Sequence, residues 1–271
     1  MTAESGHIED VRGAGFARLA GSTLVVKLVA GAALLSVWEV GVRLWAPVYV
    51  ARPSGVAAVF VPVVISPAFL SAAAATLSSV LEGLLIALVS GIAVGIAMGR
   101  SFVVDRLIRY YVFGLFAMPM VAILPLITLW FGYTDGARLA TTVFAAFFSI
   151  VLNAADGAQA VPLDYLEVAR SFRTPRWRVL FDIVLPASMP YLLAGVRLAA
   201  ARALIGAVVA EFFISVNGLG FFILFNSRSF RHNQAIVAVM VLAGCGVGFE
   251  ALVNWATRRY LPWYRRDEKS R

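Results

Sequence analysis

Charged residues are scarce in this chain. Only 14% of its 271 residues are Asp, Glu, Lys or Arg, whereas a soluble domain carries about 25%. Apolar residues make up 61% of the chain, and the mean hydropathy is +0.86. A soluble protein of this length could not cover its surface with so few charges. We therefore predict an all-α integral membrane protein, with lipid as the solvent for most of the chain.

Lysine and cysteine are nearly absent. Neither of the two lysines, Lys27 and Lys269, follows a G-x-x-x-x-G run, so the sequence has no P-loop. If ATP drives the activity of this protein, another chain must bind the nucleotide. The single cysteine, Cys245, lies in an apolar run, cannot form an intrachain disulfide, and is interpreted as a packing residue.

Histidine is also rare. His7 and His232 have no Cys or carboxylate at ligand spacing, so we predict no metal site and no other cofactor. Basic residues exceed acidic ones, which gives a formal net charge of +8. Because these residues lie in short connections between apolar runs, we reject nucleic acid as a partner.

Six apolar segments are candidates for membrane-spanning helices. A helix needs about 20 mostly apolar residues to cross the hydrocarbon. The fourth candidate is the shortest and extends toward Gly136 and Ala155. The six segments are Leu24–Leu44, Ala74–Met98, Ile108–Trp130, Leu139–Leu152, Met189–Phe213 and Ala235–Ala256.

Most Lys and Arg residues outside these segments lie on the side of the N-terminus, if all six segments cross. The positive-inside rule then places both termini in the cytoplasm. Residues 1–23 carry three acidic residues and lack an apolar core after a basic start, so we expect a cytoplasmic arm, not a signal peptide. We assign 24–71 to the first span and a periplasmic loop, 72–258 to the transmembrane domain, and 259–271 to a basic cytoplasmic tail.

Small residues repeat every four positions in two spans. The first set is Ala87, Gly91, Gly95 and Gly99, and the second is Gly195, Ala199, Ala203 and Ala207. Such a smooth face lets another helix approach closely. In the third span, Pro119 and Pro125 predict a kink.

A polar and basic stretch, EVARSFRTPRWRVLFDIVLP, interrupts the apolar segments at Glu167–Pro186. Asp164 with Glu167 forms a capping-box pattern, which predicts a helix ending near Phe172. Thr174 before Pro175 predicts a second helix, which we expect to stop before Pro186. Together the two short helices would protrude into the cytoplasm and transmit a displacement to the adjoining spans. Their basic face would be Arg170, Arg173, Arg176 and Arg178, and their apolar face Leu166, Phe172, Trp177, Leu180 and Phe181.

This stretch resembles the cytoplasmic loop that permeases of ABC importers present to their ATPase. The family pattern is E-A-A, three residues, G, nine residues, then I-x-L-P. The residues that match at the right spacing are Glu167, Ala169, Ile183, Leu185 and Pro186. The resemblance implies a coupling loop at about 162–187.

Two positions depart from the pattern. Val168 replaces the middle Ala, which is a mild change, and Arg173 replaces the Gly. Because that Gly lies at the bend between two helices, Arg173 requires either a bend without a positive φ or a strained one.

A second resemblance follows the loop. The sequence LPASMPYLLAGVRLAAARALIGAVVAEFF, then GLG at Gly218–Gly220, is similar to the nitrate/sulfonate/taurine branch of these permeases, as is the Pro53–Ser54 pair. The family has the type I ABC importer permease fold, with six transmembrane helices, and the resemblance implies a location in the inner membrane of a bacterial cell. It implies a second permease copy, two cytoplasmic ATPase subunits and a soluble binding protein on the outer face.

Three ionisable residues of the fifth span are candidates for a pathway or a gate: Arg197, Arg202 and Glu211. Ionisable groups inside a span are costly and usually face a cavity or a partner. Arg202, near the middle, would suit a small anion or would hold a gate by bonding to a neighbouring span. A fixed ion pair of Arg202 with Glu82 is the alternative. The spacing of nine residues makes Arg202 and Glu211 an unfavourable pair.

Two other function classes compete with the permease of an ABC importer. An ion-coupled secondary transporter would need carboxylates or broken helices at mid-membrane, and no in-span carboxylate is clearly central. An intramembrane enzyme would need a nucleophile and base or a metal motif, and the spans contain neither. The sequence leaves open whether the solute is an organic or inorganic anion, such as a sulfonate, taurine or nitrate, or a vitamin precursor.

Overall fold

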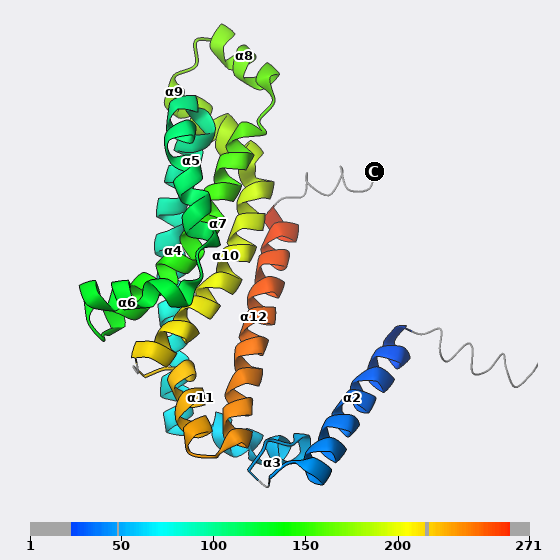
Figure 1. Ribbon diagram of the computed structural model, residues 1–271. Helices are drawn as coiled ribbons and strands as arrows, with labels where there is room; N and C mark the ends of the chain where they lie inside the picture. Colours follow the sequence, from blue (N-terminus) through cyan, green and yellow to red (C-terminus); the bar gives the residue numbers. More distant parts are fainter. Residues whose placement is uncertain (1–22, 48, 215–216, 261–271) are drawn as a thin grey trace, which may run out of the picture.

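The computed structural model describes residues 23–47, 49–214 and 217–260, and all regular elements in these ranges are helices (Figure 1). The expected arm at 1–23 and basic tail at 259–271 lie almost entirely outside the described residues. In chain order the helices are α2 (Thr23–Trp45), α3 (Pro53–Val64), α4 (Pro67–Arg100), α5 (Phe102–Ala117), α6 (Met120–Phe131), α7 (Asp135–Gln159), α8 (Leu163–Ser171), α9 (Arg176–Arg178), the π-helical segment η1 (Val179–Val184), α10 (Leu185–Ile214), α11 (Leu219–Arg228) and α12 (His232–Tyr260).

Five helices in the described residues are long and apolar enough to cross a membrane, and a bent pair brings the number to six. The five are α2, α4, α7, the continuous run from α9 through α10, and α12. The predicted number of spans is therefore confirmed when the bent pair counts as one. The fourth span, predicted as the shortest, is extended by polar residues at both ends of α7.

The third predicted span is not a gently kinked helix. It consists of α5 and α6, which meet at 103°, and α6 projects sideways from the bundle (Figure 1). The break lies at Pro119 alone, whereas Pro125 lies inside α6. Met118, just before Pro119, is extended, as expected for a residue whose α conformation clashes with a proline ring.

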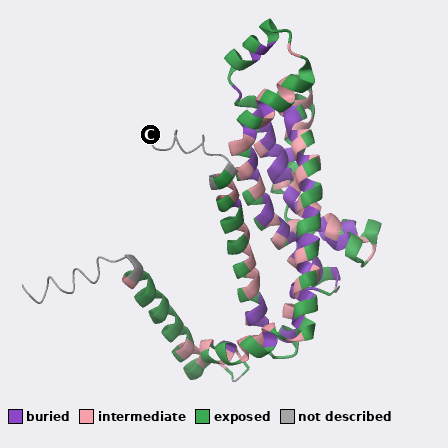
Figure 2. Cartoon of the chain, turned by 180° about the vertical axis from the view of Figure 1, so that it is seen from behind, coloured by how far each residue is buried: buried purple, intermediate pink, exposed green. Residues whose placement is uncertain are grey.

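The core of the bundle is α7 packed between α4 and α10, and α7 is the most deeply buried span (Figure 2). Both small-residue faces pack on α7. A Cβ atom on Gly95 would lie 2.5 Å from the Ala154 Cβ, and Ala199 and Ala203 are buried in one cluster with Ala146. The predicted close approach of helices is thus confirmed.

The periplasmic loop expected after the first span contains the short apolar helix α3. Its first turn carries Pro53 and is capped from α2: the Ser54 backbone N–H and hydroxyl donate to the Glu39 carboxylate at 2.9 and 2.7 Å. The Arg43 Nε also donates to Glu39, at 2.6 Å. Glu39 therefore fixes the angle between α2 and α3, because it satisfies the free N–H groups at the α3 N-terminus.

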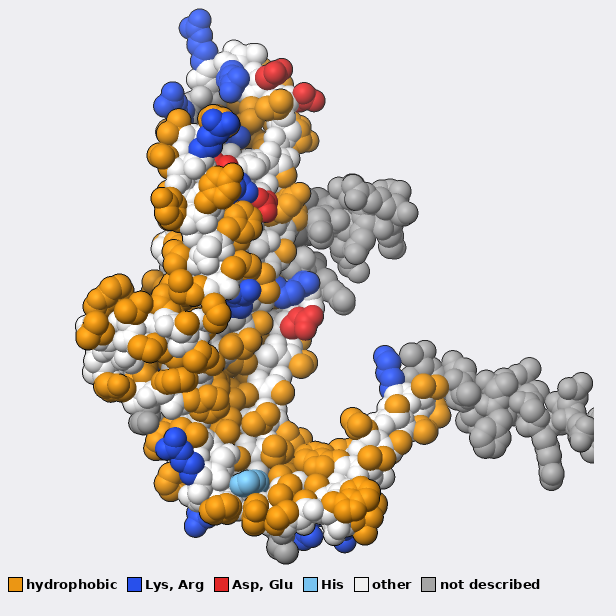
Figure 3. All heavy atoms as spheres, viewed as in Figure 1, with side chains coloured by type: hydrophobic (Ala, Val, Ile, Leu, Met, Phe, Trp, Pro, Cys, Tyr) orange, Lys and Arg blue, Asp and Glu red, His pale blue; other side chains and the backbone are white. Residues whose placement is uncertain are grey.

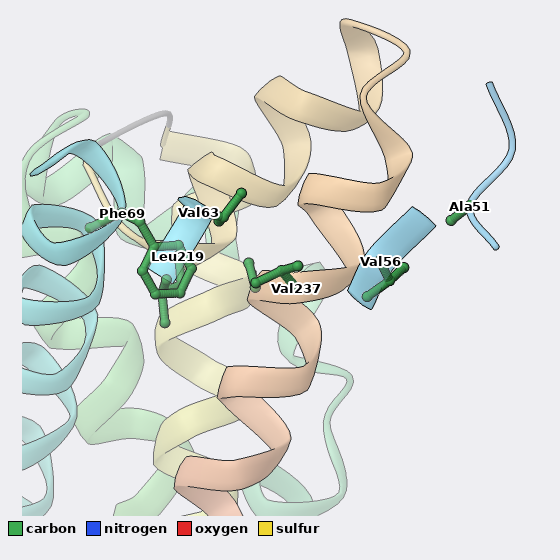
Figure 4. Close-up of a cluster of buried hydrophobic side chains, with 8 residues drawn as sticks. Ala51, Val56, Val63, Phe69, Leu219 and Val237 are labelled. Carbon is green, nitrogen blue, oxygen red and sulfur yellow. The ribbon is translucent and has the colours of Figure 1, made fainter. Parts of the chain in front are cut away.

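An apolar cluster closes the end of the bundle that lies opposite α8. It joins α3, the start of α4, α11 and α12 through Val56, Val63, Phe69, Leu219 and Val237 (Figure 4). By contrast, α2 stands away from the bundle and is exposed along its apolar length (Figures 1 and 2).

Candidate coupling loop and pathway residues

The stretch that resembles a coupling loop lies at one end of the molecule, where α8 projects beyond the bundle (Figure 1). Glu167 faces outward, whereas Ala169 is buried. Ile183 and Leu185 pack against an apolar cluster that contains Leu166 and Val184. Of the residues that match the family pattern, Glu167 thus faces outward, whereas Ala169, Ile183 and Leu185 pack against the bundle. Pro186 is exposed.

The bend between α8 and α9 is made by Arg173, which has a φ of 49°. The Arg173 N–H donates to the Arg170 carbonyl and the Thr174 N–H to the Ala169 carbonyl, both at 2.9 Å. These two bonds form a Schellman motif, in which a left-handed residue usually is Gly. The strained bend is therefore the one that occurs, at a cost of about 1–2 kcal/mol relative to glycine.

The predicted caps of the loop helices are wrong. The N-cap of α8 is Pro162 and that of α9 is Pro175, and neither Asp164 nor Thr174 caps a helix with its side chain. Asp164 instead lies in the first turn of α8, where its negative charge interacts favourably with the helix dipole.

The second helix also does not stop before Pro186. It continues through η1 into α10, so that one helix runs over Arg176–Ile214. A proline ring clashes with the carbonyl four residues earlier, here that of Asp182, and the wider π-helical turn gives the ring room.

The surface of the loop is basic and aromatic. Four arginines line a cavity of about 980 Å³ between α8, η1 and the end of α4: Arg100, Arg170, Arg173 and Arg176. Basic side chains gather at this end of the molecule (Figure 3). Of the expected apolar face, Phe172 (80% exposed), Trp177 and Phe181 are exposed, whereas Leu166 is buried and Leu180 packs inward. The exposed aromatic rings give the loop an apolar surface of the kind that protein partners cover.

Arg202 contacts the neighbouring helix α5. Its guanidinium lies 3.9 Å from the ring centroid of Phe116, and its Nη1 donates to the Phe116 carbonyl at 3.4 Å. The alternative ion pair with Glu82 does not form, since Glu82 is exposed and no ion pair of Arg202 occurs in the described part of the chain.

Glu211 lies in a buried polar cluster near the opposite end of α10, and its side chain has no exposed surface. Its carboxylate accepts from the Thr76 hydroxyl and from the Gly220 N–H, both at 2.7 Å, and lies 3.6 Å from Arg138 Nη1. The Thr76 hydroxyl also accepts from the Leu219 N–H, at 2.8 Å. This cluster ties α10 to α4, α7 and the start of α11.

Sequence reasoning did not identify Thr76 and Arg138 as partners of Glu211. Thr76 is an unremarkable hydroxyl in an apolar span. Arg138 directly precedes the apolar run that begins at Leu139, and its side chain is nevertheless only 8% exposed. The signal that could have found the cluster is the pairing of an in-span glutamate with the glycines of the GLG motif.

Arg197 donates to the Asn254 side chain and so joins α10 to α12. It lies outside both groups formed by Arg202 and Glu211. The structure therefore separates the three candidate pathway residues, as their spacing predicted for Arg202 and Glu211. In the described residues, no group of three or more His, Cys, Asp or Glu side chains could hold a metal ion.

Comparison with known proteins assigns the chain to a family. The model of the "binding-protein-dependent transport system inner membrane component" family matches residues 83–266. The formylaminopyrimidine transport permease protein of Halalkalibacterium halodurans is 27% identical over 86% of this chain and 94% of that protein. The nitrate import permease protein of Leptolyngbya laminosa is 31% identical over 70% of this chain and 68% of that protein.

Among solved structures, an amino acid ABC transporter crystallised with histidines is similar in fold. Its TM-score is 0.60 at 18% identity, over 71% of this chain and 94% of that chain. The match confirms the expected helical permease fold. Members of the matched family are the transmembrane subunits of ABC transporters, in which a separate chain hydrolyses ATP. The chain belongs to the family of inner-membrane permease components of binding-protein-dependent ABC transport systems.

Proposed function

We propose that this chain forms the translocation pathway of an importer for a small solute, by alternating access driven by two ATPase subunits that bind the loop at 162–187. The solute is an organic or inorganic anion, such as a sulfonate, taurine or nitrate, or a vitamin precursor. The observation that carries this proposal is the exposed elbow formed by α8, α9 and η1, which is continuous with a spanning helix.

The helix that starts at the elbow is long enough to carry its motion across the membrane. Arg176–Ile214 contains 39 residues, which corresponds to about 58 Å at 1.5 Å per residue. The close packing of the small faces of α4 and α10 on α7 favours movement of these three helices as one body. A displacement of the elbow by ATP binding would therefore tilt the bundle and open the pathway to the other side.

Two elements support a second copy of the chain as partner. Helix α6 projects at 103° to α5, with Leu129, Trp130 and Phe131 exposed, and α2 is exposed along its apolar length. A second copy that covers α6 would place the pathway between the two protomers. The elbow end would face the cytoplasm with both termini, and the opposite end would receive the binding protein.

The proposal is tested with the candidate ATPase and binding protein from the same genome, co-expressed with the chain. We expect the ATPase to co-purify and to drive uptake into proteoliposomes, and we expect Phe172→Ser with Trp177→Ser to abolish both. The matched control, for co-purification of the ATPase alone, is Phe230→Ser, which removes an exposed aromatic ring between α11 and α12, at the end opposite α8 (Figure 1). Retention of the ATPase by the double variant, or uptake without ATP, would overturn the proposal.

The ion-coupled secondary transporter is not favoured. Membership of the permease family argues against it, and Glu211, the most buried in-span carboxylate described, is engaged by three partners. An intramembrane enzyme has no more support, since the described spans present no arrangement that activates a nucleophile.

A further inference from the structure

A pocket of about 250 Å³ lies half-way along the bundle, where α5 ends and α6 begins. Its wall is apolar except for one residue, Arg202 from α10. The apolar residues come from the α5–α6 break and from α7 and α10, and they are Leu115, Phe116, Met118, Met120, Phe144, Ala145, Phe148 and Ile205. An apolar wall with one convergent polar group is the usual composition of a small-molecule site.

Among the described residues, no carboxylate neutralises the charge of Arg202. A guanidinium has five N–H donors, and Arg202 has one long bond, to the Phe116 carbonyl, and a stacking contact with the Phe116 ring. By contrast, Arg138 is bonded to Asp135 at 2.9 Å and to the Asn217 carbonyl at 2.5 Å and also faces Glu211. Because a charge in the membrane is costly without a partner, the free edge of Arg202 favours an anion.

We propose that this pocket holds the transported solute, and that the solute is a small organic monoanion, a carboxylate or sulfonate, with an apolar body. The planar guanidinium matches the two oxygens of such a head group, and stacking on Phe116 leaves its edge free to donate. The aromatic and methionine side chains accommodate the body, since methionine adapts its shape easily. A bare inorganic anion would lose its hydration water on entering the pocket, and it has no apolar body to pack against the apolar walls.

The position of the pocket connects it to the proposed transport cycle, on which this inference rests. Its walls belong to α7 and α10, the two helices joined by the elbow, and to both arms of the 103° break. Gly206 keeps this region closed, because a Cβ atom there would lie 2.7 Å from the Ala145 Cβ and 3.4 Å from the Met120 Sδ. Any shift of α5 or α6 relative to the body formed by α4, α7 and α10 therefore changes the shape of the pocket.

The test measures binding of 4-fluorobenzenesulfonate to the purified permease in phosphatidylcholine nanodiscs by fluorine NMR, with empty nanodiscs to subtract partitioning into lipid. We expect saturable binding with a dissociation constant of roughly millimolar or below. Benzenesulfonate and benzoate should compete, whereas nitrate and the cation benzylamine should not. Arg202→Gln should weaken binding about tenfold or more, since it removes a charge-assisted hydrogen bond.

The matched control is Arg106→Gln, because Arg106 also stacks on a phenylalanine, at 4.4 Å from the Phe102 ring, but lies outside the pocket. Its binding should equal that of the unmodified chain. Unchanged binding by Arg202→Gln, equal competition by nitrate, or displacement of the probe by phosphatidylglycerol in the nanodisc would each overturn the inference. The assay needs no ATPase, so its failure is distinct from failure of the elbow to bind the ATPase.

Discussion

The carboxylate of Glu211 occupies the space that a side chain on Gly218 would need. A Cβ atom on Gly218 would overlap the Glu211 carboxylate, and one on Gly220 would lie 2.9 Å from it. The two glycines of the GLG motif thus let the backbone at the start of α11 approach a buried charge, which accepts from the Gly220 N–H at 2.7 Å. The hydrogen bonds of Glu211 therefore hold the start of α11 against α10 and α4 at this end of the bundle.

Gly218→Ala should lower the free energy of unfolding by about 1–3 kcal/mol, because the displaced carboxylate loses buried hydrogen bonds. Thermal unfolding of the purified permease in detergent measures this change. The control is Gly244→Ala in α12, where a Cβ atom meets nothing within 4 Å; there alanine should be neutral or slightly stabilising. Equal stability of the two variants would contradict the role given to Glu211.

Much of the fold could be predicted from the sequence, because it follows from hydropathy. Five of the six predicted apolar runs form continuous helices. The ladders that contain Gly95 and Ala203 pack closely on another helix, as their spacing predicted, and that helix is α7. Helix α3 lies in the segment predicted to be a periplasmic loop, and its 12 residues are too few to cross the membrane. The angle at Pro119 could not be predicted either: a proline opens the helix, but packing of α6 and α5 on their neighbours sets the direction.

The local geometry of the stretch that resembles a coupling loop was only partly predicted. The position of the family Gly identified Arg173 as the bend, where the structure has a left-handed backbone. The partners of Glu211 and Arg202 could not be predicted, since Thr76 and Phe116 lie 135 and 86 residues away in the chain. Such contacts depend on the tertiary arrangement of α4, α5 and α10.

Arg173→Gly should stabilise the elbow by about 1–2 kcal/mol, because glycine adopts a positive φ without a steric cost. Hydrogen exchange measures this locally: the Thr174 amide, which closes the Schellman motif, should exchange more slowly. Arg173→Ala is the matched control, since it also removes the guanidinium but keeps a Cβ atom. If alanine slows exchange as much as glycine, repulsion among the arginines of the cavity, and not backbone strain, limits the stability of the elbow.

Gly95→Ala tests whether α4 and α7 form one tightly packed body. A Cβ atom on Gly95 would lie 2.5 Å from both the Ala154 Cβ and the Val151 carbonyl oxygen, and the latter is backbone that cannot rotate away. The helices must separate, and we expect a loss of about 1–3 kcal/mol in the free energy of unfolding, as for other overpacked cores. Gly114→Ala is the matched control, because Gly114 in α5 has no neighbour within 4 Å of an added Cβ.

The same pair of variants separates packing from transport. If α4, α7 and α10 move as one body, Gly95→Ala should reduce ATP-driven uptake more than it reduces binding of the ATPase, because the elbow itself is unchanged while its motion is less well transmitted. Gly114→Ala should alter neither. Full uptake by Gly95→Ala at normal expression would mean that the α4–α7 contact can open without loss, and that α10 alone carries the motion of the elbow across the membrane.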